Sequence, residues 1–147
     1  MDFNLSDDQQ AFVASARAFA EGVLAPNAAR WDEQSIFPKA ELQQAGELGF
    51  MGMYTPEEAG GLALSRLDAS LIVEELAAGC TATAAFLTIH NMATSMIGRY
   101  CNEATIEQWC PDLVMGSKLA SYCLTEPGAG SDAASLRTTA VLEGDDY

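Results

Sequence analysis

The first part of the chain spaces its apolar residues as an amphipathic helix does. These side chains recur three or four positions apart, at Phe12, Ala16, Phe19, Ala20 and Val23, so one helical face carries them. Ser6 precedes the run and Gln9 stands three residues after Ser6, a pair typical of a capped helix N-terminus. Pro26 is expected to end this helix, to kink it, or to open a second helix at its first turn.

Four further helices are predicted downstream, which makes about six in all. One of about three turns starts after Pro38 and stops at Gly49, where glycine permits a left-handed backbone. Residues 55–64 are expected to form a loop. Ser65 and Asp68 form another capping pair, for a helix over about residues 66–78. A long apolar helix covers residues 81–100, and Asn102 caps the last helix, which ends before Gly116 and Ser117.

The helix over residues 81–100 is apolar around nearly its whole circumference, which predicts a central, buried position. Most of it is expected to be ordinary core. Small residues such as Ala82, Ala84 and Ala85, with the pliable Met92 and Met96, would also permit a narrow slot beside it. A lone histidine on such a helix, His90, is expected to be a hydrogen-bonded structural residue rather than a catalyst.

The pattern changes after residue 117. Residues 118–124 and 136–142 carry the aromatic and β-branched residues of strands, and residues 143–146 are typical of a hairpin turn, with Tyr147 opening the returning strand. We therefore predict a mostly α fold: a helical domain over residues 1–116, then the first strands of a β domain over residues 117–147. Since a hairpin cut at its turn leaves unpaired edge groups, we expect the chain to be part of a longer protein.

Between these two strands lies a Gly-rich loop. Gly128 and Gly130 permit unusual backbone angles and leave the amides unshielded, and Ser131 and Asp132 are suited to bonding local amides. Successive N–H groups in such a loop form a concavity for a polyanion. The alternative is a simple tight turn, which is common after strands.

Composition excludes several classes of protein. The chain has 147 residues, 49% of them hydrophobic, enough for a domain with its own core. Its formal net charge of −14, from 21 acidic against 7 basic residues, argues against nucleic acid and anionic membranes as partners. No apolar run is long enough to span a bilayer, and no signal or Arg-rich transit peptide is evident at the start. A mature organellar protein would share this last feature.

The four cysteines, Cys80, Cys101, Cys110 and Cys123, contain no C-x-x-C pair, and only His90 could join them. A metal site is therefore not expected. Free thiols in a reducing compartment are the expected state.

The string Y-C-L-T-E-P-G-A-G-S-D at residues 122–132 resembles the signature of the acyl-CoA dehydrogenases, which desaturate acyl-CoA thioesters with FAD. The opening F-N-L-S-D-D-Q-Q, the E-L-G-F-M-G-M-Y turn and the E-E-L-A-A-G-C run are similar to the family's N-terminal part. The segment from Ser65 to Met92 is most similar to the branch that acts on isobutyryl-CoA. That branch belongs to valine catabolism.

The resemblance implies which residues contact the ligands. Cofactor contact falls on Tyr122, Cys123, Leu124, Thr125, Glu126, Pro127, Gly128, Ala129, Gly130 and Ser131. Ser131 is also implied in substrate binding. Glu126 and Asp132 are expected to brace the loop, and no position of this chain matches the family's catalytic glutamate. The 147-residue chain alone is thus expected to be inactive.

The resemblance also implies an acyl-CoA substrate, electron-transfer flavoprotein as acceptor and a homotetramer, in the bacterial cytoplasm or the mitochondrial matrix. Two alternatives remain open. The first is an acyl-CoA oxidase, which shares the architecture but passes electrons to oxygen. The second is a helical interaction domain without a cofactor, because most of the apolar stripes are ordinary core.

Overall fold

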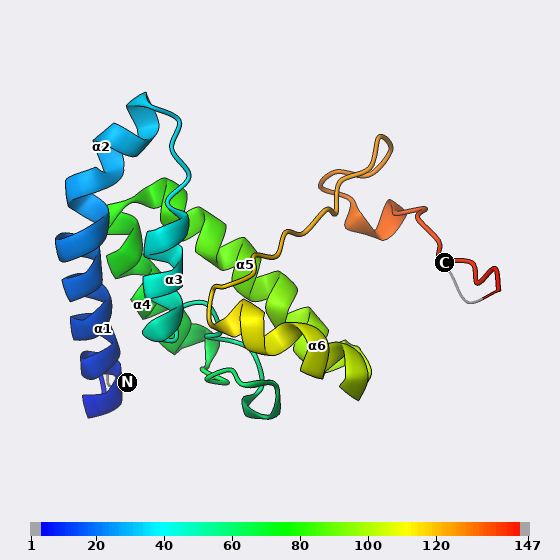
Figure 1. The fold of residues 1–147 in the computed structure, drawn as a ribbon, viewed down its shortest axis with the longest axis horizontal. Helices are drawn as coiled ribbons and strands as arrows, with labels where there is room; N and C mark the ends of the chain where they lie inside the picture. Colours follow the sequence, from blue (N-terminus) through cyan, green and yellow to red (C-terminus); the bar gives the residue numbers. More distant parts are fainter. Residues whose placement is uncertain (1–3, 145–147) are drawn as a thin grey trace.

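The computed structural model describes residues 4–144 and contains six α-helices in that range (Figure 1). They are α1 (Asp7–Phe19), α2 (Ala25–Glu33), α3 (Lys39–Glu47), α4 (Arg66–Gly79), α5 (Thr81–Tyr100) and α6 (Glu103–Val114). The mostly helical fold and the expected number of helices are therefore confirmed.

The predicted caps are present at three helix starts. The Ser6 hydroxyl accepts the Gln9 N–H at 3.2 Å, and the Gln9 side-chain oxygen accepts the Ser6 N–H at 3.1 Å. Ser65 accepts the backbone N–H of Asp68 at 3.2 Å, and the Asn102 oxygen accepts an amide of the first turn of α6 at 2.9 Å. Each cap satisfies an amide that the helix leaves without a partner.

A five-residue π-helix, Ala20–Leu24, joins α1 to α2 without a break. Pro26 lies in the first turn of α2, where a missing N–H does no harm. Of the three outcomes expected for this proline, the start of a second helix is confirmed. The side-chain amide of Asn27 donates to the Val23 carbonyl at 2.9 Å, which supplies one carbonyl of the widened turn with a donor.

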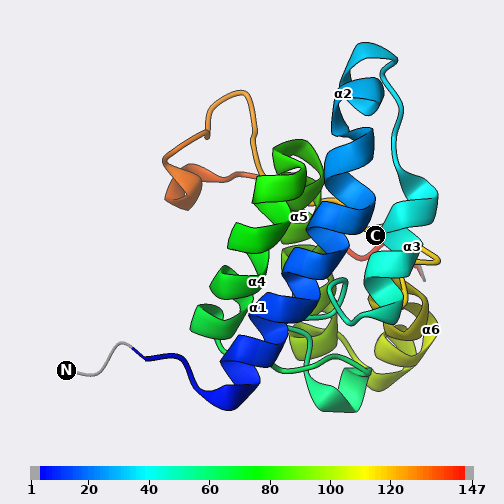
Figure 2. The same ribbon diagram turned by 90° about the vertical axis from the view of Figure 1, so that its left-hand side faces the viewer.

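The core forms where α4 packs between α1 and α5 (Figure 2). The largest apolar side chains with under 2% exposure come from five segments: Leu24, Leu42, Met51, Met53, Ile72, Leu76 and Leu87. Burying each such side chain contributes roughly 1.5–3 kcal/mol. The helical body is therefore a packing unit in its own right.

Asn91 fixes the connection after α3 to this core. Gly49 ends the helix in the left-handed region, with φ 82°, as predicted. The fully buried Asn91 accepts the Met53 N–H at 2.7 Å and donates to the carbonyl oxygens of Phe50 at 2.8 Å and Leu87 at 2.9 Å. A side chain of α5 thus replaces the secondary-structure partners that this turn lacks.

The expectation that α5 is buried all round is wrong. One of its faces carries Ala85, Ile89, Met92 and Met96, and Ile89 and Met96 are 42% and 37% exposed. Helices α4 and α6 and the turn after α3 pack against other parts of α5. Along the apolar stripe Met92 is half-buried, whereas Ala85, Ile89 and Met96 are exposed.

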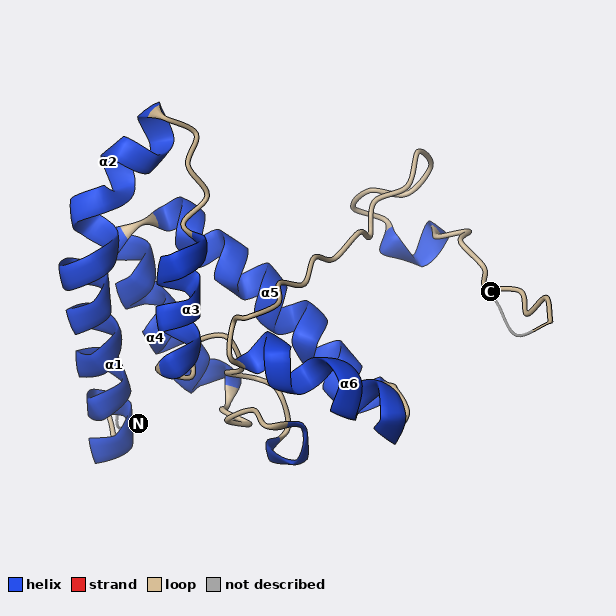
Figure 3. Ribbon diagram, viewed as in Figure 1, coloured by secondary structure: helices blue, strands red, loops and turns tan. Residues whose placement is uncertain are grey.

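After α6 the chain leaves the helical body in extended form (Figure 3). The strands predicted at residues 118–124 and 136–142 are not formed within the described part of the chain, where β-bridges occur at single residues: between Glu126 and Ala129, and at Glu143. A strand needs a neighbour for its N–H and C=O groups, and neither predicted strand has a ladder of backbone hydrogen bonds within residues 4–144. The predicted hairpin turn lies partly outside the described residues, and Tyr147 wholly so. The division at residues 116 and 117 stays a prediction.

Candidate functional site

The segment that carries the Gly-rich motif is attached to the helical body at three successive residues. The Lys118 N–H donates to the Asp112 carbonyl at 3.1 Å, and the Lys118 ammonium lies 2.8 Å from the Asp112 carboxylate. Leu119 packs against the core. The Ala120 N–H donates to Nδ1 of His90 at 3.0 Å. Beyond Ala120, residues 121–125 make no hydrogen bond to the described helical body.

His90 is fully buried, and both its ring nitrogens are engaged. Because the Ala120 amide can only donate, Nδ1 must be the acceptor, so the ring proton lies on Nε2. Nε2 then donates to the Leu113 carbonyl at 3.0 Å. Burial lowers the pKa of His90. The hydrogen bond to the Leu113 carbonyl raises the pKa, but by less. The expectation of a hydrogen-bonded structural histidine is confirmed.

The motif folds into a tight turn. Glu126 and Ala129 exchange two backbone hydrogen bonds of 3.0 and 3.1 Å, with Pro127 and Gly128 at the tip. Ala129 is buried, whereas Gly128 and Gly130 are exposed. The Gly-rich stretch is therefore a two-residue turn closed on itself.

The Glu126 carboxylate links this turn to residues 137 and 138 by hydrogen bonds. Its two oxygens accept the backbone N–H groups of Arg137 at 2.8 Å and of Thr138 at 2.9 Å, and the Thr138 hydroxyl as well. These three donors, the Thr138 hydroxyl first, lower the pKa of Glu126. These contacts confirm the expectation that Glu126 bonds the loop itself.

Asp132 is a second brace, as expected. Its carboxylate accepts the Ser135 hydroxyl at 2.5 Å, and its carbonyl accepts the Ser135 N–H at 3.1 Å. These bonds form the single-turn 3-10 helix Ala133–Ser135. Ser131, which precedes Asp132, stays exposed.

The two motif glycines do not use the angles expected of them, since neither has a positive φ. Both are instead surrounded by open space: a Cβ built on Gly128 or Gly130 would meet nothing within 4 Å. Their amides have no partner within residues 4–144, whereas the Ala129 amide is used inside the turn. The turn therefore presents two unshielded N–H groups, and the exposed hydroxyls of Thr125 and Ser131 lie on either side of it in the sequence.

The predicted contact residues Tyr122 to Ser131 follow directly after the tether, the three residues 118–120 that attach the segment to the helical body. Most of them are exposed, whereas Leu124 and Glu126 are half-buried and Ala129 is buried. The stretch offers backbone groups and donors for an anion. The apolar stripe of α5 belongs to the same helix that holds the tether through His90. A planar polar ligand and an apolar chain would therefore find their contacts on adjoining elements.

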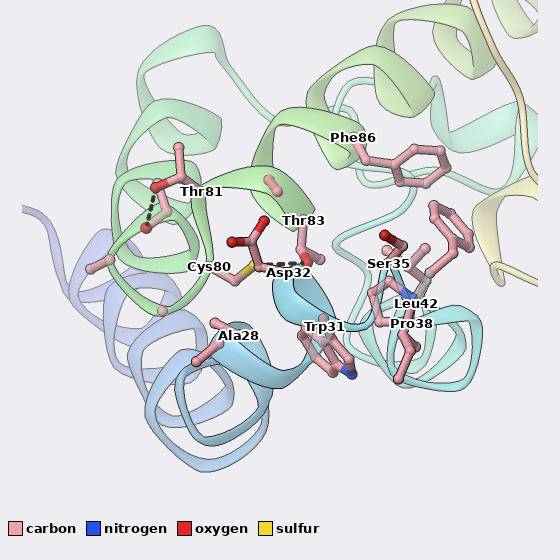
Figure 4. Close-up of a pocket in the computed structure, with 17 residues that line it drawn as sticks. Ala28, Trp31, Asp32, Ser35, Pro38, Leu42, Cys80, Thr81, Thr83 and Phe86 are labelled. Carbon is pink, nitrogen blue, oxygen red and sulfur yellow. Dashed lines mark hydrogen bonds between the residues drawn. The ribbon is translucent and has the colours of Figure 1, made fainter.

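A cleft of about 630 Å³ lies between α2, the turn before α3 and the start of α5 (Figure 4). Trp31, Phe37, Pro38, Cys80 and Phe86 are among its lining residues, and the rings of Phe37 and Phe86 meet edge to face at 5.1 Å. No local sequence pattern predicts this cleft, because its walls come from segments far apart in the chain.

Within residues 4–144 no group of three or more His, Cys, Asp or Glu side chains could hold a metal ion. The four cysteines are free. None of the described helices is both long and apolar enough to cross a membrane.

Solved structures that superpose on nearly the whole of this chain, with 30% or more sequence identity, include dehydrogenases, one of them in complex with reduced FAD. Residues 6–117 match the family described as acyl-CoA dehydrogenase, N-terminal domain. The chain belongs to the acyl-CoA dehydrogenase family.

Known proteins of this family resemble the chain over nearly its whole length. The mitochondrial isobutyryl-CoA dehydrogenase of Bos taurus is 48% identical over 143 residues, which cover 97% of this chain and 34% of that protein. The butyryl-CoA dehydrogenase structure from Megasphaera elsdenii is 37% identical, with a TM-score of 0.80 over 94% of this chain and 37% of that one. A glutaryl-CoA dehydrogenase from Mycobacterium smegmatis, solved with FADH2, is 30% identical, with a TM-score of 0.86 over 95% and 36%. The chain thus spans about a third of the length of these relatives.

Proposed function

We propose that this chain is the N-terminal part of an FAD-dependent acyl-CoA dehydrogenase that desaturates a short or branched acyl-CoA such as isobutyryl-CoA. The observation that carries the proposal is the 48% identity to an isobutyryl-CoA dehydrogenase over 143 residues. That match extends beyond the helical body into the signature segment.

The stretch from Tyr122 to Ser131 is suited to a flavin dinucleotide. Its backbone at residues 122–124 would meet the ring edge, and the Thr125 hydroxyl would lie near the ring. The free amides of Gly128 and Gly130 would approach the diphosphate, since a Cβ built at either residue meets nothing within 4 Å beyond its immediate chain neighbours. Ser131 would bond the diphosphate or the CoA part of the substrate.

In the proposed reaction a carboxylate takes the α-proton of the thioester, and bound flavin supplies the acceptor for the β-hydrogen as hydride. This chain supplies placement rather than the base. Glu126 accepts three hydrogen bonds, so it holds the turn in shape while its neighbours orient the ligand.

The apolar stripe of α5 would form one wall of the acyl site. Ala85 leaves room beside the larger Ile89 and Met92, and removing a short hydrocarbon chain from water against such a surface gains about 0.8 kcal/mol per buried CH₂.

Electron-transfer flavoprotein is the proposed acceptor, and a homotetramer the proposed assembly. The mitochondrial relative supports a matrix location, and the alternative is the bacterial cytoplasm. These proposals concern the complete protein, of which the residues described here hold only the helical body and the signature segment.

The direct test uses the full-length protein. We expect flavin absorbance in the purified protein and reduction of an artificial electron acceptor under anaerobic conditions when isobutyryl-CoA is added. Oxygen consumption without an added acceptor would favour an acyl-CoA oxidase instead. A colourless protein that fails to take up FAD would favour a cofactor-free helical domain and would refute the proposal.

A pair of matched glycine substitutions tests the role of the turn. Gly130→Ala adds a methyl group where the chain itself has open space, so it should weaken FAD binding about tenfold, or about 1.4 kcal/mol, without lowering the stability. Gly22→Ala, in the π-helix, also meets nothing within 4 Å and should leave FAD binding unchanged. Equal FAD affinity in both variants would argue against the turn as the diphosphate site.

The 147-residue chain alone should neither retain FAD tightly nor dehydrogenate isobutyryl-CoA. Equilibrium dialysis and the same anaerobic assay check this expectation. A yellow and active 147-residue product would contradict it.

A further inference from the structure

We propose that His90 is a positioning residue for the flavin-contacting segment, acting through its Nδ1 atom on the Ala120 amide. The inference rests on the proposed function, because it concerns where Tyr122 to Thr125 meet the flavin. It goes beyond that function by assigning a role to a fully buried residue of α5 that lies outside the signature.

The location of the tether is the first argument. Ala120 is the last residue before the turn that hydrogen-bonds to the described helical body. An extended chain rises about 3.3 Å per residue, so Tyr122 begins its contacts about two such steps later. A shift of the Ala120 amide therefore carries directly to the flavin-contacting stretch.

The two ring contacts of His90 are not equivalent. The Leu113 carbonyl, which accepts the Nε2–H, also accepts the Gly116 N–H at 3.1 Å, so this carbonyl keeps a donor when the imidazole is absent. The half-buried Ala120 amide has no second acceptor within residues 4–144. The Nδ1 contact is thus the one on which the segment depends.

The surroundings of the ring hold Nδ1 in the acceptor role. Phe86 stacks against the imidazole with centroids 6.1 Å apart, and the Thr94 hydroxyl lies 3.3 Å from Nε2. With Nε2–H directed at the Leu113 carbonyl, Nδ1 faces Ala120 without a proton. A ring with one fixed orientation and one fixed tautomer is suited to setting the position of the extended segment that starts at Ala120.

Two variants separate the two ring atoms. The side-chain oxygen of His90→Asn can occupy the Nδ1 position and accept the Ala120 N–H, but it cannot reach the Leu113 carbonyl. The side-chain amide of His90→Gln reaches the Nε2 position and leaves Ala120 without an acceptor. The first readout is hydrogen exchange of the Ala120 amide by NMR in the 147-residue chain, which needs no flavin. The second is the FAD dissociation constant and the flavin reduction potential in the full-length protein.

The proposal expects His90→Asn to keep Ala120 protected and FAD affinity near that of the wild type. His90→Gln should lose the Ala120 protection and bind FAD about tenfold more weakly, with a shifted flavin potential. The reverse order, or equal FAD binding in both variants, would overturn the inference and leave His90 with a role in the helical body alone. If neither histidine variant folds, Ala120→Pro removes the donor with His90 intact, and it must weaken FAD binding to the same degree or the inference fails.

Failure of the proposed function gives a different result. If the wild-type full-length protein binds no FAD, the function is refuted, and with it any flavin-positioning role. If the wild type binds FAD and the variants match it, only the inference is refuted.

Discussion

The helical body and the segment after it, residues 118–144, differ in how their polar groups are hydrogen-bonded. In the body, buried Asn91 and His90 make hydrogen bonds to backbone groups of distant segments, as burial requires. In the segment, Glu126 and Asp132 bond their own loop, while the amides of Gly128 and Gly130 face open space.

This difference separates the residues that fold the protein from those proposed to bind the flavin. In the body, a methyl group added to a glycine meets packed neighbours, so the substitution should alter the free energy of unfolding. In the turn at Gly128 and Gly130, an added methyl group meets no neighbour within the described chain, so the substitution should alter ligand binding alone. Glycine substitutions show the contrast most clearly, because each adds one methyl group.

The largest effect is expected from Gly46→Ala in α3. Its new Cβ would lie 2.3 Å from the Met115 carbonyl oxygen and 3.0 Å from the Gly116 nitrogen, which forces α3 and the end of α6 apart. Overpacking of this kind costs about 3 kcal/mol, measurable by urea unfolding. The matched Gly130→Ala should change stability by less than about 0.5 kcal/mol. Similar losses in both variants would remove the distinction between the two regions.

The next largest effect is expected from Asn91→Leu. The substitution leaves the buried Met53 N–H without its 2.7 Å acceptor and the Phe50 carbonyl without its donor. An unsatisfied buried group costs about 1–3 kcal/mol, so we expect a loss of about 2 kcal/mol in urea unfolding. Asn27→Leu is the control, because Asn27 is only partly buried and its two partners are the Val23 carbonyl and the exposed Arg30 side chain. An unchanged midpoint for Asn91→Leu would show that the turn after α3 does not depend on this amide.

The smallest effect is expected from acid, and it should act at the junction of the two regions. Burial lowers the pKa of His90 below 6.5, so the unfolded chain binds a proton more readily than the folded one. The stabilisation from neutral His90 is therefore complete above pH 6.5 and is lost as the pH falls from 6.5 through the lowered pKa. Glu126 behaves similarly at lower pH: its stabilisation is present above 4.5 and is lost as the pH falls through its lowered pKa.

Unfolding curves measured across this pH range check the order of the two steps. In His90→Asn the free energy of unfolding should no longer fall just below pH 6.5, but it should still fall below pH 4.5. A wild-type stability that is flat until the pH reaches 4.5 would contradict the role given to His90.

Much of the helical body could be predicted from the sequence, because its signals are local. The caps at Ser6, Ser65 and Asn102 and the stop at Gly49 depend on residues within one turn of each other, and each is present. The π-helix before Pro26 could not be predicted, since a proline in the first turn permits several backbone paths. The prediction that α5 is buried all round was wrong, because sequence periodicity shows how apolar a helix face is but does not show what covers that face.

The segment was harder to predict for a related reason. Residues 118–124 have the composition of a strand, but a strand forms only beside another strand. The bracing roles of Glu126 and Asp132 followed from their neighbours in the turn, whereas the bonds from Glu126 to Arg137 and Thr138 span 11 and 12 residues. The contact between His90 and Ala120 spans 30 residues, and no local pattern indicates it.

Amide hydrogen exchange of the full-length protein, with and without FAD, tests the central claim most directly. The account predicts that FAD slows exchange at residues 122–131, above all at Gly128 and Gly130, and leaves the core of α4 and α5 unchanged. Exchange at residues 122–131 that is equally fast in both states, while FAD is bound, would contradict the claim that this segment holds the flavin.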